Sequence, residues 1–384
     1  MARVVFHRPT VWASDIQCST KVLSRLTAAR GHDVTYLQAP LDPVHLMRGP
    51  GGYLKVWRAT PRSEAGVHIV TQATPVPVRD IWPLSTRTAS HLRYGLARPG
   101  LAQVMPDPDL VWTTVPGSGR ALKRAFPKAR VAFHVVDYYP AFRGDAVKPI
   151  EAEDYASVDV VHTISTTLKA YAVDELGVPE GKVHVLGQGV EREIYAGDPA
   201  EPAALAPLPH PRAVWTGVLS KGDPALFEAV AAEMKARGGS LALIGPGAGW
   251  ADDLAARYPG TVFLMGSVAP RDLPAWLVHC DLGVMLYDRS KQAVYKGQNP
   301  LKLYEYAAAG LPILSTPHDE YAHLAPPAEV LSDEGAVAPA IARALSDDPD
   351  RDRAIDTFAT THSWQSKVDR ILAEIGLPPE GPTP

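Results

Sequence analysis

The sequence predicts an α/β protein made of two doubly wound, Rossmann-like domains in tandem. Three observations support this expectation. The chain has 384 residues, more than one hydrophobic core usually supports. Strand-like and helix-like segments alternate along most of it, and a stretch at 197–211 with five prolines and no periodicity separates two such runs. We therefore expect domains at 1–196 and 212–360, joined by a linker at 197–211.

The first domain opens with a β-α-β unit. Residues 3–6 are strand-like, Ser14 can cap a helix over 14–30, and Gly31 suits the left-handed position after that helix. The next strand is expected at 32–37, and strands joined in this way form parallel sheets with right-handed crossovers. Further strands and helices alternate over 109–137 and 159–190.

The second domain repeats this alternation. Strands or helices are expected at 212–219, 224–238, 240–245, 249–258, 261–266, 273–280 and 281–287. A segment at 361–376 has apolar residues at helical spacing, and we expect it to cross back to the first domain, followed by a frayed tail at 377–384. Ligands of doubly wound sheets bind at the carboxyl ends of the strands, which predicts a site in the cleft between the domains.

Bulk composition excludes several classes of protein. A net charge of −4 and a sequence pI near 6.4 give no global signature of nucleic-acid binding, so no nucleic-acid partner is expected. Cys18 and Cys280 are the only cysteines, which leaves neither a disulfide framework nor a cysteine zinc site. Without a signal peptide or a membrane-spanning run, the expected location is cytoplasmic, with membrane contact at most peripheral.

The most informative stretch is NPLKLYEYAAAGLPILST at 299–316. Asn299 is expected to cap a helix, Pro300 to take its first position and Gly310 to end it. Lys302 and Glu305 are three residues apart and share one helix face. On spacing alone, a solvated surface ion pair is the more ordinary explanation of this pair.

A family resemblance changes the interpretation of that pair. The run PLKLYEYAAAGLPIL resembles the nucleotide-sugar motif of GT-B glycosyltransferases, as do AARGHDVTYL, GVLSKG at 217–222, ALIGPG at 242–247 and CDLGVMLY at 280–287. The resemblance implies that Lys302 meets the diphosphate of a UDP-sugar donor and that Glu305 accepts hydrogen bonds from its ribose. A lysine near a helix N-terminus suits a diphosphate, and a carboxylate suits a diol.

The same resemblance extends to further residues and to a narrower family. It places Gly217, Lys221, Gly245, Met265, Leu301 and Tyr304 at the donor site. The segments VVDYYPAF, GQGVER and NPLKLYEY are similar to xanthan-type glucuronosyltransferases, which implies transfer of a hexosyl or glucuronosyl group in polysaccharide synthesis.

Two departures from the family pattern bear on the stereochemistry. Retaining family-four enzymes carry a glutamate eight residues before the ribose-binding one, where this chain has Gly297. Their phosphate-binding arginine is also missing, because Val218 follows Gly217 and leaves only Lys221 as a partial equivalent. We therefore expect an inverting transferase that needs neither metal nor cofactor. The alternatives are a retaining family-four-like transferase, a nucleotide-sugar 2-epimerase and a nucleotide-sugar-binding protein without turnover.

Asp137 is the candidate catalytic residue. It ends the strand-like run ARVAFHVVD, where an acid at the carboxyl end of a strand can serve as a general base or merely cap a turn. Similarity to the xanthan-type enzymes implies the general base. Four residues that follow other strand-like runs are expected in the cleft as positioning or structural groups: His7, Arg8, Glu191 and Arg192.

Two further segments carry weaker signals. Residues 45–62 and 82–98 mix Arg or Lys with Trp, Tyr and Leu, as a surface that contacts anionic lipid would, although two loops flanking a strand are the slightly more ordinary explanation. On the first interpretation the sugar acceptor is lipid-linked. VPGSGRAL begins like a dinucleotide fingerprint, but Leu122 stands where its third glycine belongs, so we exclude a nicotinamide site.

Overall fold

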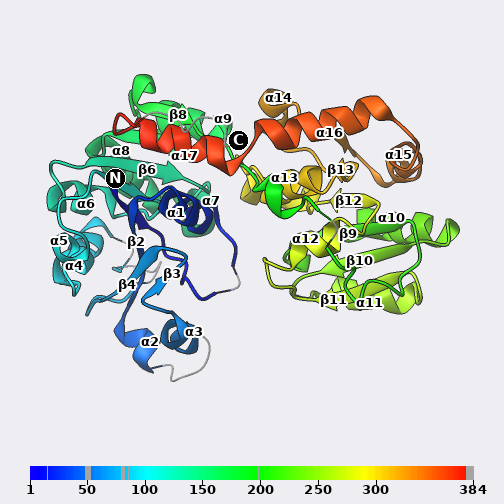
Figure 1. Cartoon of the computed structure of the whole chain (residues 1–384), viewed down its shortest axis with the longest axis horizontal. Coiled ribbons are helices and arrows are strands. Elements are labelled where there is room, and N and C mark those ends of the chain that lie inside the picture. The colour runs from blue at the N-terminus through cyan, green and yellow to red at the C-terminus, as the bar shows by residue number, and fades with distance from the viewer. Residues whose placement is uncertain (15, 48–52, 79–82, 85, 198, 378–384) are drawn as a thin grey trace. The chain divides into compact units, whose positions relative to one another are not determined.

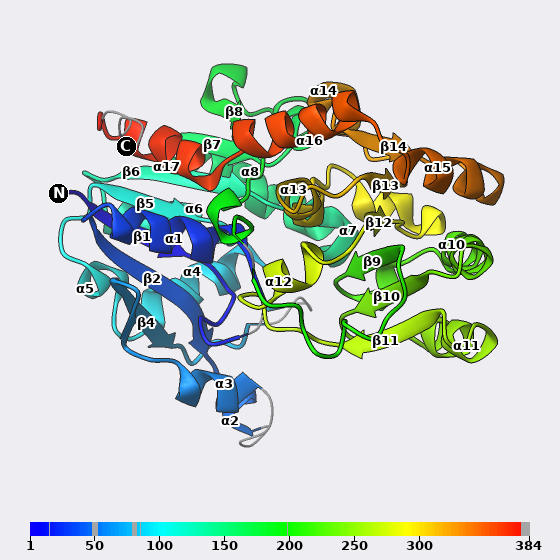
Figure 2. The same ribbon diagram turned by 45° about the vertical axis from the view of Figure 1, so that its right-hand side comes forward.

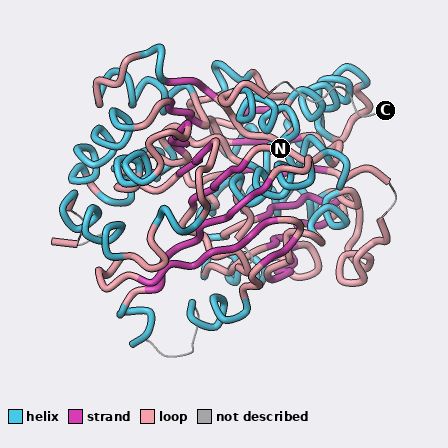
Figure 3. The backbone as a smooth tube through the Cα atoms, turned by 60° about the vertical axis from the view of Figure 1, so that its left-hand side comes forward, coloured by secondary structure: helices cyan, strands magenta, loops and turns pink. Residues whose placement is uncertain are grey.

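The computed structural model describes residues 1–14, 16–47, 53–78, 83–84, 86–197 and 199–377. The chain divides into two compact units. The first contains 1–187, 296–298 and the segment from Trp364 onwards, and the second contains 188–295 and 299–363. Each unit has one sheet of largely parallel strands with helices packed around it (Figures 1 and 3). The predicted α/β class with two Rossmann-like domains is confirmed.

The first unit is built on an eight-stranded sheet. Its order is β3 (Ser63–Glu64), β4 (Val67–Ala73), β2 (Asp33–Leu41), β1 (Arg3–His7), β5 (Leu110–Thr113), β6 (Arg130–Val135), β7 (Val160–Thr163) and β8 (Val183–Val185). Only the β3–β4 pair is antiparallel among these strands. Consecutive parallel strands must be joined by a connection that returns the chain to the same edge of the sheet, and the helices form these connections.

The helices of the first unit are mostly short. They are α1 (Ser19–Ala29), α2 (Pro43–Met47), α3 (Tyr53–Ala59), α4 (Arg87–Leu96), α5 (Leu101–Val104), α6 (Gly119–Ala125), α7 (Pro140–Arg143), α8 (Lys148–Ser157), α9 (Thr166–Ala170) with a π-helical turn at Tyr171–Glu175, and α17 (Trp364–Ala373). Helix α17 lies alongside α1 (Figure 2). Arg30, which caps α1, pairs with Asp369 at 2.7 Å and ties the C-terminal helix to this unit.

Helix α1 begins later than the sequence predicts. Cys18 occupies its N-cap position, and the Ser14 hydroxyl donates to Val11 O instead of capping the helix. The Lys21 ammonium donates to the carbonyl oxygens of Ser14 and Ile16 at 2.7 and 2.9 Å. Lys21 therefore provides the hydrogen bonds that these two carbonyl groups need while the backbone around them is not helical. The residue types that usually cap a helix do not reveal this interaction.

The second unit has a six-stranded parallel sheet. Its order is β11 (Val262–Gly266), β10 (Ser240–Ile244), β9 (Arg212–Thr216), β12 (Leu282–Met285), β13 (Ile313–Ser315) and β14 (Ala328–Val330). The helices around it are α10 (Pro224–Ala236), α11 (Gly249–Arg257), α12 (Leu273–Leu277), α13 (Leu301–Ala308), α14 (Tyr321–Leu324), α15 (Val337–Ala344) and α16 (Pro349–Thr361). The strand order reverses direction between β9 and β12, which is the switch point where ligands of such sheets bind.

The boundary between the units precedes the residue expected from the sequence. Residues from Gln188 onwards belong to the second unit, whereas the expected first domain extends to residue 196. Val190 and Tyr195 are buried in the second core, and the Val190 amide donates to His362 O at 3.0 Å. The described residues of 197–211 form neither helix nor strand.

Helix α13 carries the motif at 299–316 and starts one residue later than expected. Pro300 is its N-cap residue, with an extended ψ of 131°, and the Asn299 side chain accepts from the Tyr304 hydroxyl at 2.9 Å. Asn299 is therefore not the helix cap. Gly310 ends the helix as predicted, because its φ of +74° allows Leu311 N to donate back to Tyr306 O.

Candidate active site

Lys302 is a buried cation at the carboxyl edge of the second sheet. The residue is 9% exposed, and its Nζ lies 3.4 Å from the centroid of the Trp215 ring and 4.7 Å from that of Tyr287. It makes no hydrogen bond or ion pair with any residue that the structure describes. Burial, and to a smaller extent the charge of Lys221, lower the pKa of Lys302 well below its usual value. A buried ammonium without an anion is costly, so this position favours an anion supplied from outside.

Glu305 lies one turn further along α13, on the same face as Lys302. The surface ion pair that spacing alone suggested is not formed, although the charge of Lys302 still lowers the pKa of Glu305. Burial has the larger effect and raises that pKa to about 7. Within the described ranges, the carboxyl group of Glu305 has no hydrogen-bond partner, so it remains available to hydroxyl donors.

Two glycine turns bring bare backbone close to Lys302. Gly217 follows β9 with φ +111°, and Gly245 follows β10 with φ +141°. A Cβ atom on Gly245 would lie 2.0 Å from Gly217 O, and one on Gly217 would lie 3.4 Å from Lys302 Nζ. Both positions therefore require glycine, and Gly217 leaves the space beside the ammonium free of any side chain.

The other residues predicted for the donor site differ in their surroundings. Lys221 is exposed in the turn after β9, and its charge acts on Lys302, so two cations share this edge. Met265 in β11 and Leu301 at the start of α13 are half-buried. Tyr304 is fully buried, with its ring 5.2 Å from that of Phe358. The Tyr304 side chain is therefore part of the core, and its contact with a donor stays a prediction.

The first unit places His7, Arg8 and Asp137 at the carboxyl edge of its own sheet. His7 ends β1, Asp137 follows β6, and β5 lies between these strands. His7 Nδ1 is 3.0 Å from Thr113 Oγ1, and burial lowers the pKa of His7 to about 3, so the ring is neutral. Burial also lowers the pKa of Arg8, but nearby ionisable groups that include Asp137 raise it by more. Arg8 and Asp137 therefore lie close enough for their charges to interact.

Glu191 and Arg192 were expected on the same side as Asp137 but lie in the second unit. Arg192 forms an ion pair with Asp356 and donates to Thr360 Oγ1 at 2.8 Å, both on α16. These contacts attach the segment around Arg192 to α16. The neighbouring Tyr195 is buried in the core of the same unit. The structure therefore gives Arg192 an anchoring role.

The glycine-rich loop before α6 binds a carboxylate of its own chain. Asp154 on α8 accepts from the backbone N–H groups of Gly117 and Arg120. A Cβ on Gly119 would lie 3.0 Å from the Asp154 side chain. The N–H groups of this loop that a dinucleotide phosphate would need are therefore taken by Asp154. In the part of the chain that the structure describes, no group of three or more His, Cys, Asp or Glu residues could hold a metal ion.

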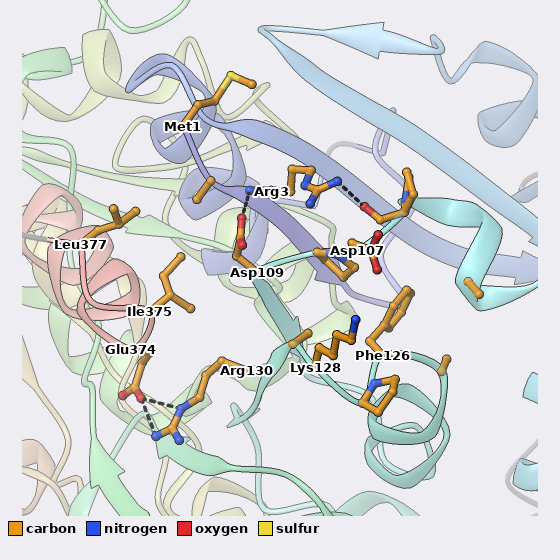
Figure 4. A pocket seen from close by; sticks show the side chains of 17 residues that line it. Met1, Arg3, Asp107, Asp109, Phe126, Lys128, Arg130, Glu374, Ile375 and Leu377 are labelled. Atoms are coloured by element: carbon orange, nitrogen blue, oxygen red, sulfur yellow. Dashed lines mark hydrogen bonds and ion pairs between the residues drawn. The ribbon is translucent and has the colours of Figure 1, made fainter.

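A cavity of about 870 Å³ lies at the opposite edge of the first sheet, where β1, β5 and β6 begin (Figure 4). Both of its arginines already have partners: Arg3 donates to Pro106 O at 2.9 Å, and Arg130 pairs with Glu374 at 3.0 Å. Ligands of doubly wound sheets bind at the carboxyl ends of the strands, which is the other edge. We therefore assign the site to the edge that carries Lys302 in spite of the size of this cavity.

Sequence reasoning missed Trp215 and Tyr287, the two rings around Lys302. Trp215 lies within β9 and Tyr287 follows β12, so neither belongs to the motif on α13. The position of Tyr287 after a strand of the predicted sheet was the one signal that could have identified it.

Two family models match the chain. The glycosyl transferase 4-like domain matches residues 19–189, and glycosyl transferases group 1 matches residues 210–347. TuaH of Bacillus subtilis (strain 168), assigned as a glycosyltransferase of teichuronic acid biosynthesis, is 27% identical over 182 residues. That match covers 46% of this chain and 44% of the relative, so the chain matches less than half the length of TuaH.

Solved structures with the same fold match almost the whole chain. A UDP-forming α,α-trehalose-phosphate synthase from Burkholderia xenovorans has a TM-score of 0.70 at 16% identity, with 97% of this chain and 99% of that one covered. Anabaena HepE, solved with UDP and glucose, has a TM-score of 0.64 at 12% identity, with 97% and 98% covered.

Together the fold and the two family models define a glycosyltransferase of the GT-B type. Within that class, the chain combines a glycosyl transferase 4-like N-terminal part with a group 1 C-terminal part. The narrower similarity to xanthan-type enzymes is not tested by these matches and stays a prediction.

Proposed function

We propose that this glycosyltransferase moves a sugar from a UDP-sugar to a hydroxyl group of an acceptor, with inversion at the anomeric carbon and without a metal ion. One observation carries the proposal: the Lys302 ammonium is buried between Trp215 and Tyr287 and has no anion among the described residues. A donor diphosphate is the kind of anion that would satisfy it. The similarity to HepE, which was solved with UDP, supports a uridine nucleotide as the carrier of the sugar.

The residues of the second unit would bind the donor and stabilise the leaving group. Lys302, assisted by Lys221 and the N-terminus of α13, meets the diphosphate as negative charge develops on it. Glu305 accepts hydrogen bonds from the ribose hydroxyls. These cations supply the electrostatic stabilisation that a divalent metal would otherwise provide, which is why we expect transfer without one.

Asp137 is the proposed general base. Its carboxylate takes the proton from the acceptor hydroxyl while that oxygen bonds to the anomeric carbon, and the carbon–oxygen bond to UDP breaks with the electron pair leaving on UDP. Inversion follows from the absence of a carboxylate at position 297. Gly297 has φ +66°, and a Cβ there would lie 2.9 Å from Leu168 Cγ, so the backbone disfavours any side chain at this position.

Donor binding is tested by titration calorimetry of the full chain with UDP. Loss of one charge-assisted hydrogen bond costs about 1.5–3 kcal/mol, so Lys302→Ala and Glu305→Ala should each weaken UDP binding by roughly one to two orders of magnitude. Lys235→Ala, at an exposed position on α10 of the same unit, is the control and should bind UDP like the wild type. Wild-type affinity in a folded Lys302 or Glu305 variant would refute the site.

The alternative functions predict different products. A 2-epimerase requires several acid/base groups around the sugar, and the chain around 290–305 offers few carboxylates. A passive binder would release no UDP from UDP-sugars, whereas a transferase hydrolyses its donor slowly when no acceptor is present. A retaining enzyme would give a product with the anomeric configuration of the donor, which NMR of the isolated product distinguishes.

We further propose that the acceptor is lipid-linked and that the first unit contacts the membrane surface. Leu46 and Met47 at the end of α2 are 61% and 83% exposed, and α3, which lies beside α2 (Figure 1), carries the exposed Lys55 and Arg58. Apolar and cationic side chains together suit an anionic bilayer. Residues 48–52, 82 and 85 of the two predicted lipid segments lie outside the described residues. No helix among the described residues is long and apolar enough to span a bilayer.

Co-sedimentation with liposomes tests this contact. The wild type should pellet with anionic vesicles at low salt and stay in the supernatant with neutral ones, since charge and apolar area both contribute. A double substitution, Leu46→Ser with Met47→Ser, should reduce the pelleted fraction several-fold. Equal recovery with both vesicle types would contradict the membrane contact without affecting the donor site.

A further inference from the structure

A second cavity lies at the carboxyl edge of the second sheet, close to Lys302. It has a volume of about 170 Å³, and Tyr287, Tyr295, Thr316 and His318 contribute to its lining. The Tyr287 ring belongs both to this lining and to the aromatic pair around Lys302. One aromatic ring therefore connects the cavity to the position proposed for the donor diphosphate.

His318 supplies an unsatisfied polar group in this lining. The residue is 8% exposed, and its Nε2 atom is buried without a hydrogen-bond partner among the described residues. Its ring meets the Tyr287 ring edge-on, with the centroids 5.2 Å apart. Burial, and then the charge of Lys302, lower the pKa of His318 to about 4, so the imidazole is neutral at pH 7. A neutral imidazole suits a hydroxyl group, to which it can donate or accept.

The charges of the lining disfavour an anionic guest. Asp288 and Asp319 both line the cavity. Arg289 also lines it, but its guanidinium is held by Asp223 at 2.8 Å and by Glu334. A carboxylate placed here would meet no unpaired arginine in the lining, because Arg289 is already held by two carboxylates, and Asp288 already has Lys291 as its partner at 2.7 Å. Desolvation of the added charge would therefore be uncompensated. The two tyrosines provide apolar ring surface of the kind that packs against a sugar ring.

We propose that this cavity is the sugar subsite of the donor site and that it takes an uncharged hexose, with His318 Nε2 hydrogen-bonded to a sugar hydroxyl. The inference rests on the proposed UDP-sugar donor and deepens it, since it selects a hexose over a uronic acid. It therefore makes the chain a hexosyltransferase, against the glucuronosyl alternative that the xanthan-type similarity left open.

Calorimetry with three probes tests the subsite: UDP, UDP-glucose and UDP-glucuronate. The full-length wild type should bind UDP-glucose at least about 10-fold more tightly than UDP-glucuronate. His318→Phe keeps an aromatic ring and removes both nitrogens, so it should bind UDP like the wild type but UDP-glucose about 2- to 10-fold more weakly. His318→Gln, which restores a hydrogen-bonding group, should recover part of the loss. His323→Phe, at an exposed position on α14, is the matched control.

The outcomes separate the two proposals. If the wild type does not bind UDP, the proposed function fails and the sugar subsite fails with it. If UDP binds but His318→Phe weakens UDP and UDP-glucose equally, His318 acts on the diphosphate or on folding, and the subsite is overturned. Tighter binding of UDP-glucuronate than of UDP-glucose would overturn the selection of an uncharged sugar.

Discussion

Replacing Lys302 with methionine should make the protein more stable and less able to bind its donor. Lys302 is 9% exposed and has no anionic partner among the described residues, so desolvation of its charged form is uncompensated in the ligand-free protein. Methionine has a similar length and no charge, and it can occupy the space between the Trp215 and Tyr287 rings. Stability and binding should therefore change in opposite directions.

The size of the stability change follows from two opposing contributions. Desolvation of a buried ion costs several kcal/mol in a folded protein. The interaction of the ammonium with two aromatic faces returns about 2 kcal/mol, and methionine loses it. The difference should raise the free energy of unfolding by about 1–3 kcal/mol. UDP binding should weaken by roughly one to two orders of magnitude, because one charge-assisted contact is lost.

Two measurements on the same samples check this reasoning. Urea denaturation followed by fluorescence gives the free energy of unfolding, and calorimetry gives the UDP affinity. Lys235→Met, an exposed substitution in the same unit, should change neither quantity appreciably. A Lys302→Met protein that is less stable than the wild type and still binds UDP with wild-type affinity would show that the lysine is a structural group and not an anion site.

Three further results are expected. Asp137→Asn should keep UDP affinity, because the donor residues lie in the other unit, and should lower the transfer rate about 10²- to 10⁴-fold in a UDP-release assay; turnover within a few-fold of wild type would require another base. Gly297→Ala should lower the free energy of unfolding by about 2–4 kcal/mol, because alanine disfavours the positive φ and its Cβ would collide with Leu168. Gly310→Ala is the control, with φ +74° and open space around it, and should lose only about 1 kcal/mol. Equal losses in urea denaturation would contradict the contact with Leu168. Above the pKa of Glu305, which is about 7, UDP affinity should rise as the pH falls, since the lowered pKa of Lys302 means that its charged fraction grows as protons are added while the phosphates of UDP stay ionised. Lys302→Arg stays charged throughout, so calorimetry should show no such rise for it above the pKa of Glu305, and a wild-type profile without this slope would argue against Lys302 as the binding cation.

The sequence predicted those features of the fold and site that depend on short-range patterns. Alternating apolar segments and helix-spaced stretches gave the strands and helices of both sheets, because each periodicity is a local property. The spacing of Lys302 and Glu305 placed both on one face of α13, as the structure shows. Gly310 could be identified as the helix end, since a left-handed residue after a helix has a strong local preference for glycine.

Features that depend on distant contacts could not be predicted in this way. The rings around Lys302 come from β9 and from the end of β12, so their approach depends on the strand order of the sheet. Ser14 has the chemistry of a cap, but Lys21 stabilises a different backbone conformation around it. Tyr304 was assigned to the donor site from its place in the motif, yet its side chain points into the core beside Phe358.

The division of the chain constrains how the protein could be re-engineered by module exchange. The polypeptide passes from one unit to the other after Gly187, Tyr295, Gln298 and Ser363. A chimera with a single junction near the middle of the chain would therefore take α17 from a different parent than α1. It would lose the packing of α17 on α1 and the Arg30–Asp369 ion pair. A donor-binding cassette transplanted from this enzyme should comprise 188–363, and a recipient should keep its own C-terminal helix and its own residues at the positions of 296–298.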